Sequence, residues 1–527
     1  MRKLLLFYLI LPLQLLAQGK YFIYFKDKQD QKVYLSDRAL ERRSKQGISI
    51  TDKDYPVNND YLNALKNLGI QIEGVSKWLN AALIHCNPDQ LKQALNFSFV
   101  KGMEGEGDIR GDTSLGKYAR IRSKFRQELD VIPELDQLKM LGADTMLNAG
   151  FNGKGVLVAV MDGGFIGLKS AKVFEHLDII HTYNYVHKTS EVDRDDTHGT
   201  NVLSIIAGKL GQGFSGPAPA VDLALYTTED VIAVNESKIE EVYWLLAAEH
   251  ADSLGADIFN TSLGYSQFTD PNQDYTYQDM DGQTSIIARA ADYASKVGIL
   301  VVVAAGNEGN SSWKYISSPA DAEYAIAVGA VNAQRTLASF SSIGPSPDGR
   351  VKPDVCAMGV GTVYSNSGTQ LRAGNGTSYA APLITGFLAS LKQQFPHLTA
   401  LQLREALIHS ADRFPNPTPQ YGYGIPSYTR AVRYIYGNWS ALGNEAMNDK
   451  VTIFPQPNGG DFNIRVGESL LPNNTEIWIL DENGRQIRKD TPGGKSFKEL
   501  NEGLHLLRFQ YEGKWFTAKW LKRNETP

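Results

Sequence analysis

Continuous apolar, β-branched segments alternate with helical patterns through the middle of the chain, and this alternation leaves few folds open. Five such segments recur, at residues 156–161, 221–226, 258–262, 299–305 and 325–331. Helical periodicity occupies residues 239–254 and 285–296 between them. Strands that are apolar on both faces and alternate with helices are typical of a parallel sheet covered on both sides. The sequence therefore predicts an α/β fold with a doubly wound parallel sheet.

The regions on either side of this sheet differ from it in pattern. Residues 18–125 combine short apolar strands with helix-like stretches at 36–46 and 60–68, which indicates a small α/β domain. The parallel-sheet domain is assigned to the whole of residues 126–436.

A third domain follows the sheet. A polar linker at 437–449 leads into residues 450–527, which contain only short strands separated by turn residues. This pattern is typical of a small β-sandwich.

The first residues predict export. A basic start at Met1-Arg2-Lys3 precedes an apolar run at 4–16, and Ala17 offers a small residue for cleavage. This is the pattern of a signal peptide, assigned to residues 1–17. The run is shorter than the roughly 20 residues that a membrane span needs, so we expect a secreted protein, extracellular or attached to the cell surface.

Charge and cysteine content exclude other classes. The 53 basic and 58 acidic side chains leave a net charge of −5, and no basic excess exists to neutralise a nucleic acid backbone. Nucleic acid is therefore not expected as a partner. Cys86 and Cys356 are the only cysteines, too few for a disulfide framework or a cysteine-rich zinc site.

Four residues at the ends of strands or the starts of helices form a candidate catalytic set. Asp162 follows the strand 156–161, His198 and Ser378 each open a helical stretch, and Asn307 follows the strand 299–305. A serine hydroxyl becomes a nucleophile when a base takes its proton, and the base needs a carboxylate to orient it. The order Asp, His, Ser is one in which such triads occur, and an Asn amide can donate to an oxyanion.

Each residue alone also has a purely structural interpretation. An Asp after a strand is often a cap, a His before Gly-Thr can be a core residue, and Gly-Thr-Ser is a common turn. Their chain order, their placement at element ends and the local sequences around all four residues favour the catalytic interpretation.

Those local sequences resemble the signatures of the subtilisin-like serine peptidases, the subtilases. The resemblance rests on Val160-Met161-Asp162-Gly163-Gly164, His198-Gly199-Thr200-Asn201-Val202, Ala304-Ala305-Gly306-Asn307 and Gly376-Thr377-Ser378-Tyr379-Ala380-Ala381-Pro382. It implies a subtilisin-like fold, with Asp162 as the orienting acid, His198 as general base and then acid, and Ser378 as nucleophile. Asn307 is implied as the oxyanion donor. Gly163 departs from the family, which usually has Ser or Thr there, and we expect a weakened local hydrogen bond rather than an inactive triad.

The resemblance also implies where a peptide substrate binds. Ser262, Leu263 and Gly264 resemble the strand that pairs with the substrate and forms one wall of the specificity pocket. Ala304, Ala305 and Gly306 are implied as the other wall. These segments carry no charge, so we expect a preference for uncharged, apolar P1 side chains.

The flanking domains resemble known companions of subtilases. Residues 18–125 are similar to subtilase propeptides, which assist folding and then inhibit, and the basic joint before residue 126 is expected to hold the maturation cut. Residues 450–527 resemble the sorting domain of the type IX secretion system of the Bacteroidota. That resemblance implies the secretion machinery as a partner, and its alternative is a carbohydrate-binding or substrate-docking sandwich.

The sequence thus predicts a secreted serine endopeptidase made as a zymogen, acting on proteins or peptides as a monomer. The alternatives are a catalytically silent subtilase scaffold that serves as a surface binding module, and a hydrolase acting mainly on esters. No cofactor or metal is required for the chemistry. Calcium has no specific motif, although an acidic loop at 265–283 carries four aspartates.

Overall fold

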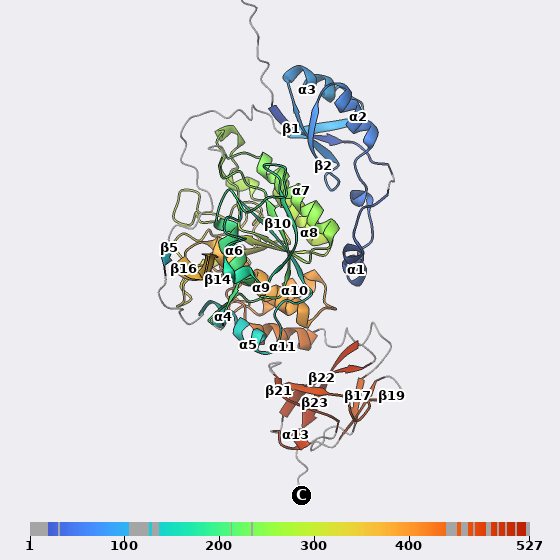
Figure 1. The fold of residues 1–527 in the computed structure, drawn as a ribbon, viewed down its shortest axis with the longest axis vertical. Coiled ribbons are helices and arrows are strands. Elements are labelled where there is room, and N and C mark those ends of the chain that lie inside the picture. Colours follow the sequence, from blue (N-terminus) through green and yellow to red (C-terminus); the bar gives the residue numbers. More distant parts are fainter. Residues whose placement is uncertain are drawn as a thin grey trace, which may run out of the picture.

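The structure is a computed structural model of the 527-residue chain (Figure 1). The structure describes residues 19–29, 32–104, 126–128, 136–211, 213–232, 236–438, 451–454, 462–466, 469–480, 486–492, 495–500, 503–511 and 514–522. The predicted signal peptide, the expected maturation joint and nearly all of the predicted linker lie outside the described residues.

The N-terminal domain is a four-stranded antiparallel sheet in the order β2-β3-β1-β4, with helices on one face. Local sequence explains its helix ends: Asn87 and Gln90 form a reciprocal capping box, and Pro88 occupies the first helical position. The elements are β1 (Gly19–Phe25), α1 (Asp37–Lys45), a 3-10 turn (Asp52–Asp54), α2 (Asn59–Asn67), β2 (Gln71–Ser76), β3 (Ala81–Cys86), α3 (Pro88–Leu95) and β4 (Val100–Glu104).

The central domain contains a seven-stranded sheet in the order β14-β13-β12-β11-β6-β10-β7, and every adjacent pair of its strands is parallel. The predicted doubly wound parallel sheet is confirmed. Its strands are β6 (Leu157–Asp162), β7 (Asp178–Asn184), β10 (Asp222–Thr227), β11 (Ile258–Thr261), β12 (Leu300–Ala304), β13 (Ile326–Val331) and β14 (Val355–Met358).

Helices cover both faces of this sheet because its strands are apolar on both sides. The longer helices are α4 (Asp136–Leu141), α5 (Ala143–Asn148), α6 (His198–Ala207), α7 (Ile239–Leu254), α8 (Ile286–Lys296), α9 (Thr377–Gln394), α10 (Ala400–His409) and α11 (Tyr428–Asn438). One core joins α6 and α9 to Val158 and Val160 of β6, and a second core joins α7 and α8 to Leu157 and Ala159 on the opposite face. α11 runs two residues past the predicted boundary at 436, and the Asn438 side chain donates to the Tyr434 carbonyl within its last turn.

Smaller elements complete the central domain. They are short 3-10 turns at Lys172–Phe174, Pro271–Gln273 and Tyr277–Asp279, the pair β8 (Lys209–Leu210) and β9 (Phe214–Ser215), and a three-stranded sheet of β15 (Thr362–Ser367), β16 (Gln370–Gly374) and β5 (Arg126–Glu128). Sequence periodicity did not indicate these strands because they are short or carry polar residues.

The N-terminal domain lies against α7 and α8 (Figure 1). Phe22, Trp78 and Leu83 on one face of its sheet join the same apolar core as these two helices. Ile23 and Ile84 on the other face pack into a separate core with α2 and α3. Its sheet is therefore buried on both sides.

The C-terminal domain consists of two antiparallel sheets that share one apolar core. Arg508 links it to the central domain by donating to the carbonyl of Gln394 at the end of α9, at 3.0 Å. The two sheets are consistent with the expected sandwich. Its elements are β17 (Val451–Phe454), β18 (Asn463–Val466), β19 (Ser469–Leu470), β20 (Ile477–Leu480), β21 (Gln486–Asp490), α13 (Lys495–Lys498), β22 (Gly503–Tyr511) and β23 (Lys514–Lys522).

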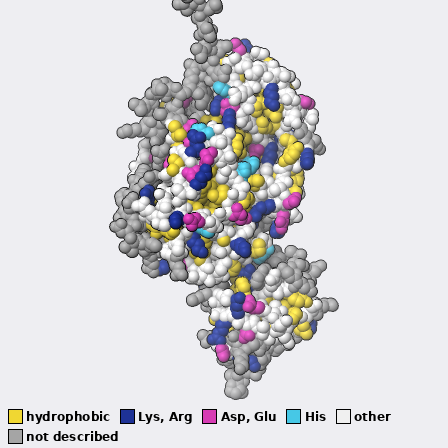
Figure 2. All heavy atoms as spheres, in the orientation of Figure 1, with side chains coloured by type: hydrophobic (Ala, Val, Ile, Leu, Met, Phe, Trp, Pro, Cys, Tyr) yellow, Lys and Arg dark blue, Asp and Glu magenta, His cyan; other side chains and the backbone are white. Residues whose placement is uncertain are grey.

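The surface mixes acidic and basic side chains over the face shown in Figure 2, as the near-balanced charge leads one to expect. Within the described residues, no helix combines the length and apolar character needed to cross a membrane.

Candidate active site

The predicted catalytic residues gather at the carboxyl edge of the central sheet. Asp162 is the last residue of β6, Ser262 follows β11, and Asn307 follows β12 by three residues. These three strands are neighbours in the sheet. Ligands of open α/β sheets bind outside the carboxyl ends of the strands, so the topology alone places these residues where a site belongs.

Asp162 and His198 form a buried hydrogen-bonded pair. The Oδ1 atom of Asp162 lies 2.8 Å from Nδ1 of His198, the first residue of α6. The same oxygen accepts the backbone N–H of Gly163 at 2.8 Å, which fixes the carboxylate. Asp162 is fully buried and the His198 side chain is 9% exposed. Because Nδ1 of the His198 ring faces a carboxylate, Nε2 is the ring nitrogen that remains available to accept a proton.

This environment changes the basicity of the histidine. Burial disfavours the charged ring, but the adjacent Asp162 carboxylate outweighs burial and raises the pKa of His198 above 6.5. Asp196 and Glu229 add to the increase. A more basic imidazole accepts a proton from a hydroxyl more readily.

Ser378 is the second residue of α9 and is fully buried. Its Oγ atom and Nε2 of His198 make no hydrogen bond to any other described residue. The ring of Tyr379, the next residue, lies 6.1 Å from the His198 ring, centroid to centroid. The partial positive charge of a helix N-terminus lies at Ser378, where it favours developing negative charge.

Asn307 is held in one orientation by Thr377. Its Oδ1 atom accepts the backbone N–H of Thr377 at 2.9 Å and the Thr377 hydroxyl at 3.0 Å. The amide nitrogen therefore faces the other way. A Cβ atom placed on Gly376 would lie 2.9 Å from Ser378 Oγ and 3.6 Å from Asn307 Nδ2, so both atoms border the same small space. The N–H groups of Asn307 and Ser378 can together donate to an oxyanion there.

The Ser262 side chain bonds to the first turn of α9, and its predicted role in substrate binding stays a prediction. Its hydroxyl donates to the Ser378 carbonyl at 3.1 Å. That carbonyl needs a donor because Pro382, four residues later in α9, has no N–H. The hydroxyl thus links the end of β11 to the first turn of α9.

The other predicted substrate residues also line this edge. Leu263 is buried and Gly264 half-buried, and Tyr265 exchanges two backbone hydrogen bonds with Ser318. Ala304 and Ala305 are fully buried. Gly306 has a φ of +115°, and a Cβ there would lie 2.6 Å from Ser342 Oγ. A larger residue at 306 would therefore be strained and crowded.

Gly163, where a Ser or Thr was expected from the family resemblance, lies in a crowded place. A Cβ there would lie 2.6 Å from Cγ1 of Val231 and 3.1 Å from Oε2 of Glu229. A larger side chain would require these two side chains to shift. The Asp162–His198 hydrogen bond is present without one.

The aspartates of the acidic loop hold local backbone. Asp270, Asp274, Asp279 and Asp281 each accept a nearby backbone N–H. Elsewhere in the described part of the chain, three carboxylates offer oxygens within 4.8 Å of one another, those of Glu229, Glu236 and Glu240. Calcium binding in the loop stays a prediction.

Sequence reasoning missed the residues that position the catalytic groups. Thr377 was noted only as part of a signature, and it orients Asn307. Asn201 donates to the Tyr379 hydroxyl at 3.0 Å and so connects α6 to α9. Both residues belong to the signatures around His198 and Ser378. Their place in these signatures was the one sequence feature that could have pointed to them.

A doubly wound sheet that gathers Asp, His and Ser at its carboxyl edge is the architecture of subtilisin-like serine peptidases. The sequence pattern of the subtilase family matches residues 153–424, more than half of the 527 residues, and the chain belongs to this family. The pattern of the peptidase S8 propeptide domain of Bacteroidota matches residues 20–118. The N-terminal domain is therefore a propeptide domain, as predicted. A sorting domain at the C-terminus is not found by these comparisons and stays a prediction.

Curated relatives agree with the family. The chain is 32% identical over 313 residues to serine protease AprX of Bacillus subtilis (strain 168), covering 53% of this chain and 66% of AprX. It is 30% identical to the minor extracellular protease Epr of the same organism, covering 53% of this chain and 39% of Epr. The chain thus spans less than two thirds of these two relatives. Subtilisin DY of Bacillus licheniformis is 32% identical over 303 residues, covering 56% of this chain and 97% of that protein.

Solved structures with a related chain path include MycP1 from Mycobacterium smegmatis. That comparison covers 60% of this chain and 91% of MycP1, at 20% identity and a TM-score of 0.47.

Proposed function

We propose that this chain is a secreted serine endopeptidase made as a zymogen, with Asp162, His198 and Ser378 as its triad. The observation that carries the proposal is the buried Asp162–His198 hydrogen bond of 2.8 Å at the same sheet edge as Ser378. The subtilase family and the propeptide domain support it.

In the proposed first half-reaction, Ser378 Oγ bonds to the scissile carbonyl carbon while its proton passes to Nε2 of His198. Asp162 keeps Nδ1 protonated and stabilises the imidazolium. The negative oxygen accepts hydrogen bonds from Asn307 Nδ2 and the Ser378 N–H.

The first half-reaction ends when the imidazolium of His198 gives its proton to the leaving amine as the C–N bond breaks, which leaves the acyl-enzyme ester. In the second half-reaction, water enters, loses a proton to His198 and attacks this ester. Return of that proton to Ser378 releases the acid product and restores the site. This cycle needs no cofactor.

The first test compares the full chain with its Ser378→Ala variant, using casein as substrate and intact mass as a second readout. We expect the wild-type chain to lose its propeptide and degrade casein, and the variant to do neither. Ser170→Ala, which removes an exposed hydroxyl bonded to the Gly167 carbonyl, serves as the matched control and should behave as wild type. Equal processing in wild type and Ser378→Ala would overturn the proposal.

The same test discriminates the alternatives. A silent scaffold would leave casein intact even after a second protease removes the propeptide. A hydrolase restricted to esters would cleave a small ester but not casein.

We propose that the P1 pocket takes uncharged, apolar side chains. Its walls, Leu263-Gly264 and Ala304-Ala305-Gly306, contain no ionisable group. A pocket that buries a charged side chain without offering an opposite charge binds it poorly, because the lost hydration of the charge is not replaced. A peptide library cleaved mainly after Arg or Glu would contradict this.

We propose that residues 450–527 direct the chain to a type IX secretion machinery after the signal peptide has opened the route. The support is the sequence resemblance. Deletion of 450–527 in a host with that machinery should leave the enzyme inside the cell envelope, while a host lacking the machinery should retain both forms. Equal release of the full and shortened chains would contradict the proposal. The released enzyme is expected to act on proteins or peptides as a monomer.

A further inference from the structure

The propeptide contacts the central domain at a second surface, away from the catalytic edge. The contact is made by residues 32–58, here called the strap. The strap follows β1, contains α1 and ends where α2 begins. Figure 1 shows α1, the helix of the strap, well apart from α2 and α3 and beside the central domain.

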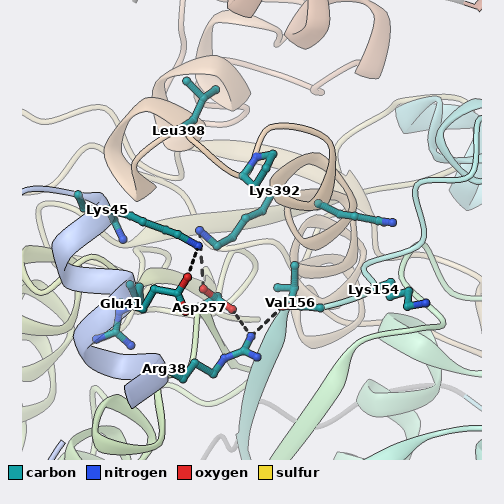
Figure 3. Close-up of a pocket in the computed structure, with 13 residues that line it drawn as sticks. Arg38, Glu41, Lys45, Lys154, Val156, Asp257, Lys392 and Leu398 are labelled. Atoms are coloured by element: carbon teal, nitrogen blue, oxygen red, sulfur yellow. Dashed lines mark hydrogen bonds and ion pairs between the residues drawn. The ribbon is translucent and has the colours of Figure 1, made fainter. Parts of the chain in front are cut away.

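The strap binds the amino edge of the central sheet. Its Arg38 reaches the amino ends of β6, β10 and β11: it donates to the Gly155 carbonyl at 2.9 Å and pairs with Asp222 and Asp257. Gln46 donates to the carbonyl of Gly298, before β12, at 2.9 Å. Figure 3 shows Arg38 and Lys392 converging on Asp257 from the two domains.

These contacts lie far from the catalytic residues. β6, β11 and β12 are 6, 4 and 5 residues long, and strands rise about 3.3 Å per residue. Roughly 13–20 Å of sheet thus separates the strap from the edge that holds Asp162 and Asn307.

Two buried arginines form the centre of this contact. Arg42 and Arg43 both pair with Asp252, in the last turn of α7, with N–O distances of 2.5 and 2.7 Å. Arg43 also pairs with Asp54 of the strap at 2.7 Å. All four side chains are at most 3% exposed. Arg42 further donates to the Ala256 carbonyl at 2.6 Å, where a helix C-terminus favours a cation.

The central domain is shaped to receive this helix. Gly255 and Gly298 have φ values of +92° and +88°. A Cβ on Gly255 would lie 2.8 Å from the backbone nitrogen of Ala39, and one on Gly298 would lie 2.5 Å from Gln46 Nε2. Every ion-pair partner of Asp252 in the described part of the chain belongs to the propeptide, namely Arg42, Arg43 and Lys77.

We propose that the strap is a second anchor, which keeps the cleaved propeptide bound and so sets the rate at which active enzyme is released. The inference rests on the proposed function. A cut between residues 104 and 126 leaves the strap on the propeptide. Dissociation then requires the sheet contact and the strap contact to be open together, and two linked contacts bind far more tightly than either alone.

The test uses the full chain with Ser378→Ala, a C-terminal tag for immobilisation and a specific protease site inserted after Gly111. After cutting, the half-life of the N-terminal fragment on the immobilised chain is measured. We expect Arg42→Met with Arg43→Met to shorten that half-life at least tenfold. Lys45→Met is the matched control, since Lys45 is exposed on the same helix and its ion pair among the described residues is with Glu41 of that helix, and it should leave the half-life unchanged.

Half-lives that agree within twofold would overturn the proposal, as would a parent chain whose fragment leaves immediately after cutting. If the double variant fails to fold, Gln46→Ala removes the Gly298 contact without disturbing buried charge and should shorten the half-life severalfold. Because the inserted site replaces self-cleavage, the result is independent of Ser378 activity. Failure of the anchor is thus distinguishable from failure of the proposed function.

Discussion

The two edges of the central sheet use buried charge in opposite ways. At the carboxyl edge, the buried Asp162–His198 hydrogen bond lies near the uncharged segments 263–264 and 304–306, and Ser378 Oγ has no hydrogen-bond partner among the described residues. At the amino edge, the buried Arg42 and Arg43 both form ion pairs with Asp252, and Arg43 forms a second one with Asp54.

This difference between the two edges matches two different tasks, chemistry at the carboxyl edge and binding of the propeptide at the amino edge. A site that performs chemistry must leave groups available to a substrate and keep one of them near its titration point. A docking surface gains specificity when each buried charge has a partner, because an unpaired one is costly. The same sheet supports both because its strand ends face opposite directions.

The largest expected effect comes from altering the Asp162–His198 hydrogen bond at the carboxyl edge. Asp162→Asn keeps the shape but favours the wrong tautomer of His198, so kcat should fall about 10⁴-fold. The measurement is peptide hydrolysis by chain whose propeptide has been removed by a second protease. A loss below tenfold would contradict the role of Asp162.

Breaking the network at the amino edge should affect stability and leave chemistry intact. Asp252→Asn leaves two buried guanidinium groups facing one remaining carboxylate, and loss of a buried partner costs roughly 3–5 kcal/mol. Urea unfolding of the zymogen, in the Ser378→Ala background, should register this loss. Asp178→Asn, at an exposed carboxylate, is the control.

The kcat of the released Asp252→Asn enzyme, with Ser378 intact, should stay within twofold of wild type. A tenfold fall in kcat would show that the two edges are not separate.

The oxyanion donor sharpens the comparison within the carboxyl edge. Asn307→Ala should lower kcat about 10²-fold with little change in KM, because the lost hydrogen bond forms only in the transition state. Thr377→Val removes one of the two donors that orient Asn307, and a smaller loss, about tenfold, is expected. A rise in KM alone would place Asn307 in ground-state binding instead.

The pH dependence of kcat/KM should depend on His198 at the carboxyl edge and not on the arginines at the amino edge. The raised pKa of His198 puts the half-maximal point of kcat/KM above pH 6.5, with activity rising as neutral imidazole forms. The same shift stabilises the fold below the unfolded-state pKa of about 6.5, and this contribution is lost as pH rises through the folded value. Arg42→Met with Arg43→Met should leave the profile unchanged. A profile that is flat between about pH 5 and 8 would contradict the assignment of His198.

The sequence predicted what depends on local pattern. The helix expected at 239–254 is α7, Ile239–Leu254, and the strands of the parallel sheet lie within a residue or two of their predicted positions. It missed β7, whose Asp178–Asn184 segment alternates in burial and lacks a continuous apolar run, and β14, Val355–Met358, which has only four residues.

What sequence could not predict depends on contacts between distant residues. A helix was expected at 36–46, but nothing in the sequence indicated that its Arg42 and Arg43 are buried, because charged side chains on a helix usually face solvent. Their burial depends on Asp252, more than 200 residues away in the chain. The same holds for the site: its residues could be listed from their signatures, but the donation from Ser262 to the Ser378 carbonyl needed the fold.

That donation makes the reactive end of α9 conditional on assembly. Pro382 removes the intrahelical donor, so the first turn of α9 is completed by a hydroxyl from β11. A nascent chain in which β11 has not joined the sheet leaves the Ser378 carbonyl to water and the turn without that anchor. We therefore expect the nucleophile to be ordered late in folding. On the proposed function, the chain therefore gains its nucleophile only after the central sheet has assembled.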